Sequence, residues 1–250
     1  ADLKGLPGIR YRDKSGQVVA NPSRPMIRDL DAIPLPAWDL FPMDIYLANP
    51  VGAPNVAKWV DGSAGRDAPL TMNVISSRGC PYKCTYCYHD FMGMKYRHRS
   101  AGNILGELRV LVEKYGVGYV HFTDDDFVID VRHVMEFCDL LKKSGLNIQW
   151  GSTGRVNIVT EELLRAMAEA GCVWMGFGIE SGSQRMLDTM KKQVTVEQAK
   201  AAIRMARRYL PKVDCSFMFG TPGENRDTIR ETVDFCKELD LAPEVIFFAT

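Results

Sequence analysis

Residues 70–89 read LTMNVISSRGCPYKCTYCYH. The run Leu70–Ser77 has the length and apolar character of a buried strand. Cys80, Cys84 and Cys87 follow it directly, with the spacing C-x3-C-x2-C and an aromatic residue before the last cysteine. The stretch therefore predicts a strand that leads straight into a thiol-rich loop.

Three closely spaced thiols suit an iron–sulfur cluster. A 4Fe–4S cluster normally takes four thiolates, so three would leave one iron open, and an open iron indicates chemistry on the molecule that it binds. Two other interpretations stay open from these residues alone. One is a structural zinc site formed by Cys80, Cys84, Cys87 and His89, and the other is a set of buried thiols without a ligand.

Apolar runs alternate with amphipathic helices from residue 70 onward, which is typical of a parallel sheet with right-handed crossovers. We expect strands at Leu70–Ser77, Gly118–Thr123, Ile148–Ser152, Val173–Ile179, Val213–Phe219 and Val245–Thr250. We expect helices near Ala101–Tyr115, Val131–Ser144, Glu161–Ala170, Gln184–Met190, Val196–Tyr209 and Arg226–Leu239. The pattern predicts an α/β fold, a partial TIM-like (β/α)6 barrel preceded by an irregular lead-in segment.

Residues that cap helix ends can also be recognised in the sequence. Ser100 and Thr160 are good N-caps, and Thr195 with Gln198 forms a capping box.

Cysteines 138, 172, 215 and 236 lie on the predicted helices and strands, where free cysteine packs as a small hydrophobic residue. We expect these four to be core thiols and not cluster ligands.

Residues 1–69 have a different character, rich in Pro, Gly and Asp. Gly8–Arg12 and Gln17–Val19 flank a glycine-containing turn and predict a small hairpin. We interpret residues 1–69 as a linker and lead-in, and residues 70–250 as the core. The chain starts at Ala1 and stops inside an apolar run, so we expect it to be a piece of a longer polypeptide.

Composition limits the class of protein. Apolar residues make up 46% of the chain, charged residues 25%, and the formal net charge is zero. This balance gives no sign of nucleic acid or an anionic membrane as a partner, and no apolar run reaches transmembrane length. Seven cysteines, partly clustered, argue against a secreted disulfide framework. A cytoplasmic location is the expectation.

Charged residues follow two further strands, where catalytic groups of parallel α/β barrels lie. Asp124, Asp125 and Asp126 come after the second strand, and three adjacent carboxylates repel one another unless a cation is bound nearby. A solvated acidic loop is the alternative. Arg155 follows the third strand and can grip a carboxylate with two hydrogen bonds, or form an ordinary surface ion pair.

The fourth and fifth strands end in motifs of a different kind. Glu180 can accept hydrogen bonds from ribose hydroxyls, as acidic residues at nucleotide sites do. Ser181 and Ser183 beside it can also cap the next helix. Gly220 lies in the turn GTPGE, where glycine lets the backbone approach a flat ligand, or simply forms a tight turn.

Successive strand ends carry cluster ligands, a carboxylate, an arginine, a second carboxylate and a glycine. The order of these groups resembles the core of the radical S-adenosylmethionine (SAM) superfamily. The segments FTDDDF, GIESGSQRML, MKKQVT and GTPGE resemble its cobalamin-binding branch, as does the lead-in GIRYRDKSGQVVANP. That branch includes methyltransferases and the anaerobic magnesium-protoporphyrin ester cyclases. The resemblance covers most of residues 5–250.

The resemblance implies that Cys80, Cys84 and Cys87 ligate a 4Fe–4S cluster, and that SAM chelates its fourth iron. An electron from the cluster would then cleave SAM to methionine and a 5′-deoxyadenosyl radical. The remaining implied contacts are Tyr86 beside the cluster or adenine, Asp124 or Asp125 at the SAM amino group, Arg155 at its carboxylate, Glu180 and Ser181 at the ribose, and Gly220 near the adenine.

The sequence departs from the family in two places. Gly223 stands where many members carry an acid, so Glu224 is given no ligand role. The cobalamin-binding stretch D-x-H-x-x-G is absent, so we expect cobalamin to be supplied by a domain outside this chain.

The leading interpretation is thus a radical SAM enzyme core for cobalamin-dependent methyl transfer or oxidative cyclisation. It would act on a small-molecule substrate and take electrons from a donor such as flavodoxin or ferredoxin. A cobalamin-independent reaction such as methylthiolation is the first alternative. A zinc-stabilised, non-catalytic α/β binding module is the second.

Overall fold

The computed structural model describes residues 3–48, 69–88, 95–242 and 246–249. Its centre is a parallel six-stranded sheet in which the spatial order follows the chain order, β3-β6-β7-β8-β9-β10. The strands are β3 (Leu70–Val74), β6 (Val117–Phe122), β7 (Gln149–Gly154), β8 (Cys172–Glu180), β9 (Lys212–Met218) and β10 (Ile246–Ala249).

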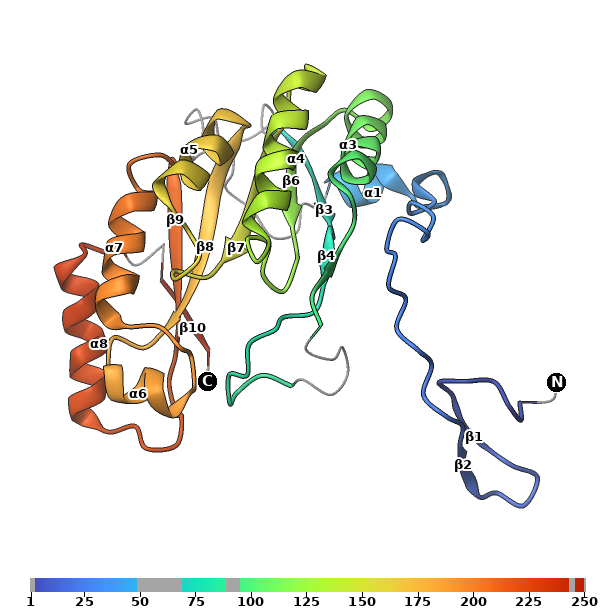
Figure 1. Ribbon diagram of the computed structural model, residues 1–250, viewed down its shortest axis with the longest axis horizontal. Coiled ribbons are helices and arrows are strands. Elements are labelled where there is room, and N and C mark those ends of the chain that lie inside the picture. Colours follow the sequence, from blue (N-terminus) through green and yellow to red (C-terminus); the bar gives the residue numbers. More distant parts are fainter. Residues whose placement is uncertain (1–2, 49–68, 89–94, 243–245, 250) are drawn as a thin grey trace.

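Helices connect these strands and pack along the outer side of the curved sheet (Figure 1). They are α3 (Ala101–Tyr115), α4 (Val131–Ser144), α5 (Glu161–Glu169), α6 (Gln184–Thr189), α7 (Val196–Ala206) and α8 (Arg226–Glu238). Contacts join α3 to α4, α4 to α5 and α5 to α7. The expected alternation of strands and helices, and with it the α/β fold, is confirmed.

The core between sheet and helices is built on aromatic residues. Phe122 of β6, Trp150 of β7 and Phe137 of α4 are fully buried and pack against one another, with Phe127 beside them. Edge-to-face packing of this kind adds to the free energy gained from burial alone. The Trp150 indole N–H donates to the carbonyl of Ala170 at 2.8 Å, which ties β7 to the end of α5.

The predicted helix caps are confirmed. The Ser100 side chain accepts from Asn103 N, and Thr160 accepts from Leu163 N. The capping box at the start of α7 has both of its expected hydrogen bonds. Cysteines 138, 172 and 215 are buried in the core as expected, and Cys236 is half-buried.

The ends of some elements differ from the expected ones. Helix α7 ends at Ala206, three residues before the expected Tyr209, because the N–H groups of Arg208 and Tyr209 bond carbonyls only three residues back, those of Met205 and Ala206. Strand β8 is longer than expected, from Cys172 to Glu180. Residues 245 and 250 of the expected last strand lie outside the described residues.

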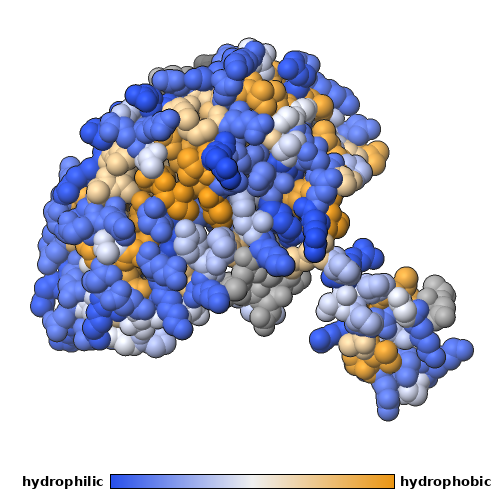
Figure 2. Space-filling model, viewed as in Figure 1, coloured by the Kyte–Doolittle hydropathy of each residue, from blue (hydrophilic) through white to orange (hydrophobic). Residues whose placement is uncertain are grey.

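The lead-in contains the predicted hairpin, as the antiparallel pair β1 (Arg10–Arg12) and β2 (Val18–Ala20). The hairpin lies apart from the core, and Figure 2 shows its small hydrophobic group separate from the larger surface of the core. Farther along, η1 (Trp38–Leu40) and α1 (Met43–Ala48) approach the core, and α1 contacts β3. The boundary between lead-in and core at residues 69 and 70 stays a prediction.

Among the helices of the described ranges, none is both long and apolar enough to cross a bilayer.

Candidate active site

The cysteine loop (residues 79–88) leaves the sheet after β3. A short antiparallel pair, β4 (Ser77–Arg78) with β5 (Arg97–His98), holds the two flanks of this segment together. Gly79 N donates to Asp125 Oδ2 at 3.0 Å, and Thr85 N donates to Met190 O at 2.9 Å. The loop is thus attached to the end of β6 on one side and to the end of α6 on the other.

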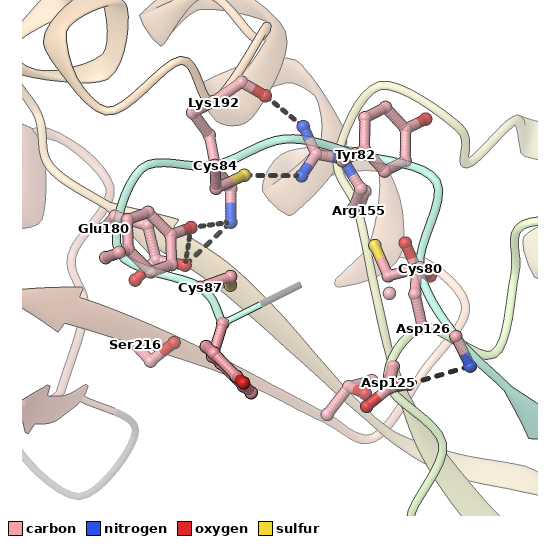
Figure 3. A pocket seen from close by; sticks show the side chains of 16 residues that line it. Cys80, Tyr82, Cys84, Cys87, Asp125, Asp126, Arg155, Glu180, Lys192 and Ser216 are labelled. Carbon is pink, nitrogen blue, oxygen red and sulfur yellow. Dashed lines mark hydrogen bonds and ion pairs between the residues drawn. The ribbon is translucent and has the colours of Figure 1, made fainter. Parts of the chain in front are cut away.

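A cavity of about 360 Å³ opens beside this loop (Figure 3). Its volume falls in the range of about 300–1,000 Å³ that is typical of small-molecule sites. Seven of the residues singled out from the sequence line it: Cys80, Cys84, Tyr86, Cys87, Asp125, Arg155 and Glu180. They come from the loops and strand ends that the parallel sheet brings to one edge.

A buried ion pair lies on one wall of the cavity. Lys192 Nζ is 2.7 Å from Glu180 Oε1, and the two side chains are 7% and 10% exposed. The Tyr86 hydroxyl donates to the same Glu180 oxygen at 3.0 Å and accepts from Lys192 Nζ at 3.0 Å. Burial raises the pKa of Tyr86 well above its usual value, so the phenol stays protonated.

The backbone around this ion pair is strained. Glu180, Lys191 and Gln193 have positive φ angles of 70°, 52° and 59°, a region that residues with a Cβ rarely adopt. Such residues concentrate at functional sites. Gly178 faces the same place, since a Cβ there would lie 2.6 Å from Glu180 Oε1.

Arg155 lies between the cysteine loop and the segment after α6. Its guanidinium stacks on the Tyr82 ring at 3.6 Å. Nη1 donates to Cys84 Sγ at 3.7 Å, and Nη2 donates to the carbonyl of Lys192. Figure 3 shows this arrangement, with Arg155 directed at the loop.

The three adjacent aspartates have separate positions. Asp124 is directed away from the cavity and accepts hydrogen bonds from Ser76 and Ser77, which satisfy its buried carboxylate. Asp125 and Asp126 line the cavity. Burial raises the pKa of Asp126 to about 7, and its Oδ2 has no hydrogen-bond partner among the described residues.

Two other residues singled out from the sequence are not among those that line the cavity. Ser181 is buried, where its hydroxyl pairs with Thr232 at 3.2 Å and accepts from Ser183 N. Gly220 has a φ of 83° and donates to Glu224 Oε2 at 2.6 Å, which closes a tight turn. The structure thus gives both residues local structural contacts.

Several lining residues were given no role from the sequence, among them Tyr82, Asp126, Lys192 and Ser216. Tyr82 lies inside the cysteine motif, and Asp126 is the third of three aspartates, so both stood in recognised motifs. Lys192 stands in the quoted segment MKKQVT, but no spacing relates it to Glu180. Ser216 lies mid-strand and carries no signal of its own.

The residues present fit an iron–sulfur cluster. Such clusters are held by thiolates, and three thiols line one cavity next to the buried cations Arg155 and Lys192. Burial raises the pKa of the thiols of Cys80 and Cys87, so cluster binding must release protons.

The zinc interpretation stays open, because one of its four ligands is not described. It requires Cys80, Cys84, Cys87 and His89 to converge on one ion. No three His, Cys, Asp or Glu side chains in residues 3–48, 69–88, 95–242 and 246–249 are grouped to hold a metal ion. His89 lies outside the described residues.

The fold and the cavity together define an α/β protein with a thiol-rich loop at one edge of a parallel sheet. The sequence profile of the radical SAM superfamily matches residues 74–236, well over half of the chain. The chain therefore belongs to the radical SAM superfamily, and the resemblance seen in the sequence is confirmed.

Individual relatives agree with this assignment. An uncharacterized methyltransferase of Pyrococcus horikoshii is 34% identical over 241 residues, which cover 96% of this chain and 48% of the relative. The anaerobic magnesium-protoporphyrin IX monomethyl ester cyclase of Rubrivivax gelatinosus is 30% identical over 244 residues, which cover 95% of this chain and 40% of the cyclase. This chain thus spans less than half the length of either relative.

Among solved structures, the radical SAM methyltransferase TsrM from Kitasatospora setae, with cobalamin and a 4Fe–4S cluster bound, has a TM-score of 0.73 with this chain. The two are 22% identical, and the match covers 99% of this chain and 47% of TsrM. At this identity the match shows a shared fold.

Proposed function

We propose that this chain is the cofactor-binding core of a cobalamin-dependent radical SAM enzyme. Cys80, Cys84 and Cys87 would ligate a 4Fe–4S cluster, and SAM would bind beside it. The sheet would form the partial TIM-like barrel expected from the sequence. The observation that carries the proposal is that the three thiols line the same cavity as Arg155 and Glu180.

The side chains of the chain bind and orient the cofactors. The Glu180 carboxylate, held by Lys192 and Tyr86, presents an acceptor for ribose hydroxyls. Asp125 lies at the cavity wall, where a carboxylate suits the SAM amino group. The proposed cofactor contacts of Asp124, Ser181 and Gly220 stay predictions, since their present contacts suit structural roles.

When bound, the reduced cluster would supply the electron for reductive cleavage of SAM. The proposed reaction class is methyl transfer or oxidative cyclisation of a small molecule, because the relatives include a methyltransferase and a cyclase. Cobalamin would come from a domain outside this chain, and the electron from a flavodoxin or ferredoxin. The protein would orient these groups and exclude oxygen and water.

The first test is anaerobic reconstitution with iron and sulfide, followed by reduction and low-temperature electron paramagnetic resonance (EPR) with and without SAM. We expect the spectrum of a reduced 4Fe–4S cluster that changes when SAM is added. A protein that takes up no cluster and instead holds one tight zinc ion would refute the proposal.

Cobalamin dependence needs a second test. We expect the full-length protein to copurify with, or bind, a corrinoid, detected by its visible absorption. A full-length protein that binds cluster and SAM but no added hydroxocobalamin would favour a cobalamin-independent reaction such as methylthiolation.

A further inference from the structure

Arg155 is a buried cation that hydrogen-bonds no carboxylate. It is 6% exposed, and its hydrogen bonds go to Asn157 Oδ1, to Cys84 Sγ and to the carbonyl of Lys192. No Asp or Glu of the described ranges lies within ion-pair distance of it, and Asp126 interacts with it only electrostatically, from farther away. Because a buried charge is costly unless an opposite charge compensates it, the site calls for a negative charge next to this guanidinium.

A thiol of the cysteine loop lies within hydrogen-bond distance of this guanidinium. Cys84 Sγ already accepts a hydrogen bond from Arg155 Nη1 at 3.7 Å. When the three cysteines ligate a cluster they do so as thiolates, and their negative charge would then face the guanidinium. A charge-assisted hydrogen bond is roughly twice as strong as a neutral one.

A second hydrogen bond of the Arg155 guanidinium holds it next to Cys84. Nη2 donates to the carbonyl of Lys192, and this residue stands between Lys191 and Gln193, both of which have positive φ. Thr85 of the cysteine loop donates to Met190 O in the same segment. The segment after α6 thus holds the loop both through its backbone and through Arg155.

Only a planar, forked cation satisfies both sites at once. The guanidinium presents donors in a rigid fork and stacks flat on aromatic rings, whereas a lysine ammonium is a point charge on a flexible stem. Here the fork spans Cys84 Sγ and the Lys192 carbonyl while its face lies 3.6 Å from the Tyr82 ring.

We propose that Arg155 is a positioning residue of the cluster, which holds the thiolate of Cys84 in place and raises the reduction potential of the bound cluster. This inference rests on the proposed function. It assigns Arg155 to the cluster ligand, whereas the sequence alone pointed to the carboxylate of SAM. Hydrogen bonds to the sulfurs and nearby charge are established determinants of cluster potential.

The physical reason is the charge of the reduced state. Reduction adds one electron to the cluster, from the 2+ to the 1+ state, with dithionite as the donor in the experiment. A buried positive charge stabilises the more negative, reduced state. Without the guanidinium, that state loses stabilisation and the midpoint potential becomes more negative.

The test is an EPR-monitored redox titration of the anaerobically reconstituted protein without SAM. We expect Arg155→Gln to bind the cluster and to lower the midpoint potential by at least about 59 mV, which is tenfold in a one-electron equilibrium. Arg155→Lys keeps the charge, so its midpoint potential should lie closer to that of the wild type than to that of Arg155→Gln. Arg109→Gln removes the same charge at an exposed position of α3 and should leave the potential unchanged.

The outcomes separate the two proposals. A wild-type protein without a four-iron cluster refutes the proposed function itself. A wild-type cluster whose potential is the same in Arg155→Gln refutes the role of Arg155 alone. If Arg155→Gln loses the cluster while Arg155→Lys retains it, the positive charge beside Cys84 is required to hold the cluster and the inference is supported. Loss from both variants, with a lowered unfolding temperature, shows that Arg155 acts only on the fold and overturns the inference.

Discussion

The thiols of the cysteine loop differ in their surroundings although they stand close in sequence. Cys84 is buried beside Arg155, Cys80 is half-buried, and Cys87 is exposed. Cys138 is buried in the hydrophobic core under α4, away from the cavity, and burial raises the pKa of its thiol to about 12. Of these four thiols, the first three line the cavity.

This difference predicts the result of cysteine replacement. Changing Cys80, Cys84 or Cys87 to Ala should abolish a stable four-iron cluster, because each change removes one thiolate ligand. Cys138→Ala is the matched control and should retain the wild-type content. Iron and acid-labile sulfide are measured after anaerobic reconstitution. A full complement of both in Cys84→Ala would refute the ligand assignment.

The buried ion pair of Lys192 and Glu180 leads to a second prediction, which concerns the free energy of unfolding. Lys192→Met should lower the free energy of unfolding by about 3 kcal/mol, because it leaves a buried carboxylate without its cation. The double variant Lys192→Met/Glu180→Gln should recover most of the loss. Urea denaturation of the protein without SAM measures both.

An exposed pair serves as the control for this prediction. Arg109 and Glu113 form an ion pair on the surface of α3, and such pairs contribute less than about 1 kcal/mol. Arg109→Met should therefore change the free energy of unfolding only slightly. Equal losses in the single and double variants at Lys192 and Glu180 would contradict a coupled pair.

At the scale of elements, α8 rests directly on the turn between β8 and α6. Gly182 N donates to Thr232 Oγ1 at 3.0 Å. A Cβ on Gly182 would lie 2.7 Å from Thr232 Cα and 2.8 Å from the carbonyl of Glu231. Because these are backbone atoms, no side chain can move aside to make room.

Gly182→Ala should therefore push α8 away from this turn and lower the free energy of unfolding by about 1–3 kcal/mol, the usual effect of overpacking. Urea denaturation measures the loss. Gly106→Ala is the matched control, since nothing lies within 4 Å of its added Cβ on α3, and it should stabilise by about 0.5–1 kcal/mol. A loss at Gly106 as large as at Gly182 would contradict the steric explanation.

In the molecule as a whole, Asp31 ties the lead-in to the core by accepting a hydrogen bond from Ser100 N at 2.8 Å, and His133 of the core lies near this contact. Its ring stacks on His98 of β5 with centroids 3.9 Å apart, and Asp130 and Asp31 of the lead-in lie in the same cluster of charges. Burial, assisted by His98, lowers the pKa of His133 to about 4, and Asp130 and Asp31 oppose this shift. The ring is thus neutral in the folded protein near pH 6.

A histidine with a lowered pKa binds fewer protons when folded than when unfolded between about pH 4 and 6.5, so stability rises with pH across this window. From pH 7 to pH 5 the wild type should lose about 1–2 kcal/mol more than His133→Gln, from a pKa difference of about 2.5 between the folded and unfolded states. Urea denaturation at both pH values gives the difference. An identical pH dependence in the two proteins would refute the assignment.

The main elements of the core and their order follow from the sequence alone. The short elements α1, η1 and the pair β4–β5 were not predicted, whereas the strands of the parallel sheet, the helices between them, the capping box at Thr195 and the thiol-rich loop were predicted and found. These features depend on local causes, namely the spacing of apolar residues, hydrogen bonds within a few positions, and the alternation that places every strand end on one edge. Because the strand ends share one edge, the position of the cavity could also be predicted.

Only the tertiary structure decided which side chains meet at that edge. Tyr86 and Lys192 are 106 residues apart in the chain, and no local pattern relates them. The roles of the adjacent aspartates are equally hard to predict, because Asp124 accepts a hydrogen bond from Ser76 whereas Asp126, two positions later, lines the cavity. Side-chain direction in loops follows from packing between distant segments, which spacing along the sequence does not encode.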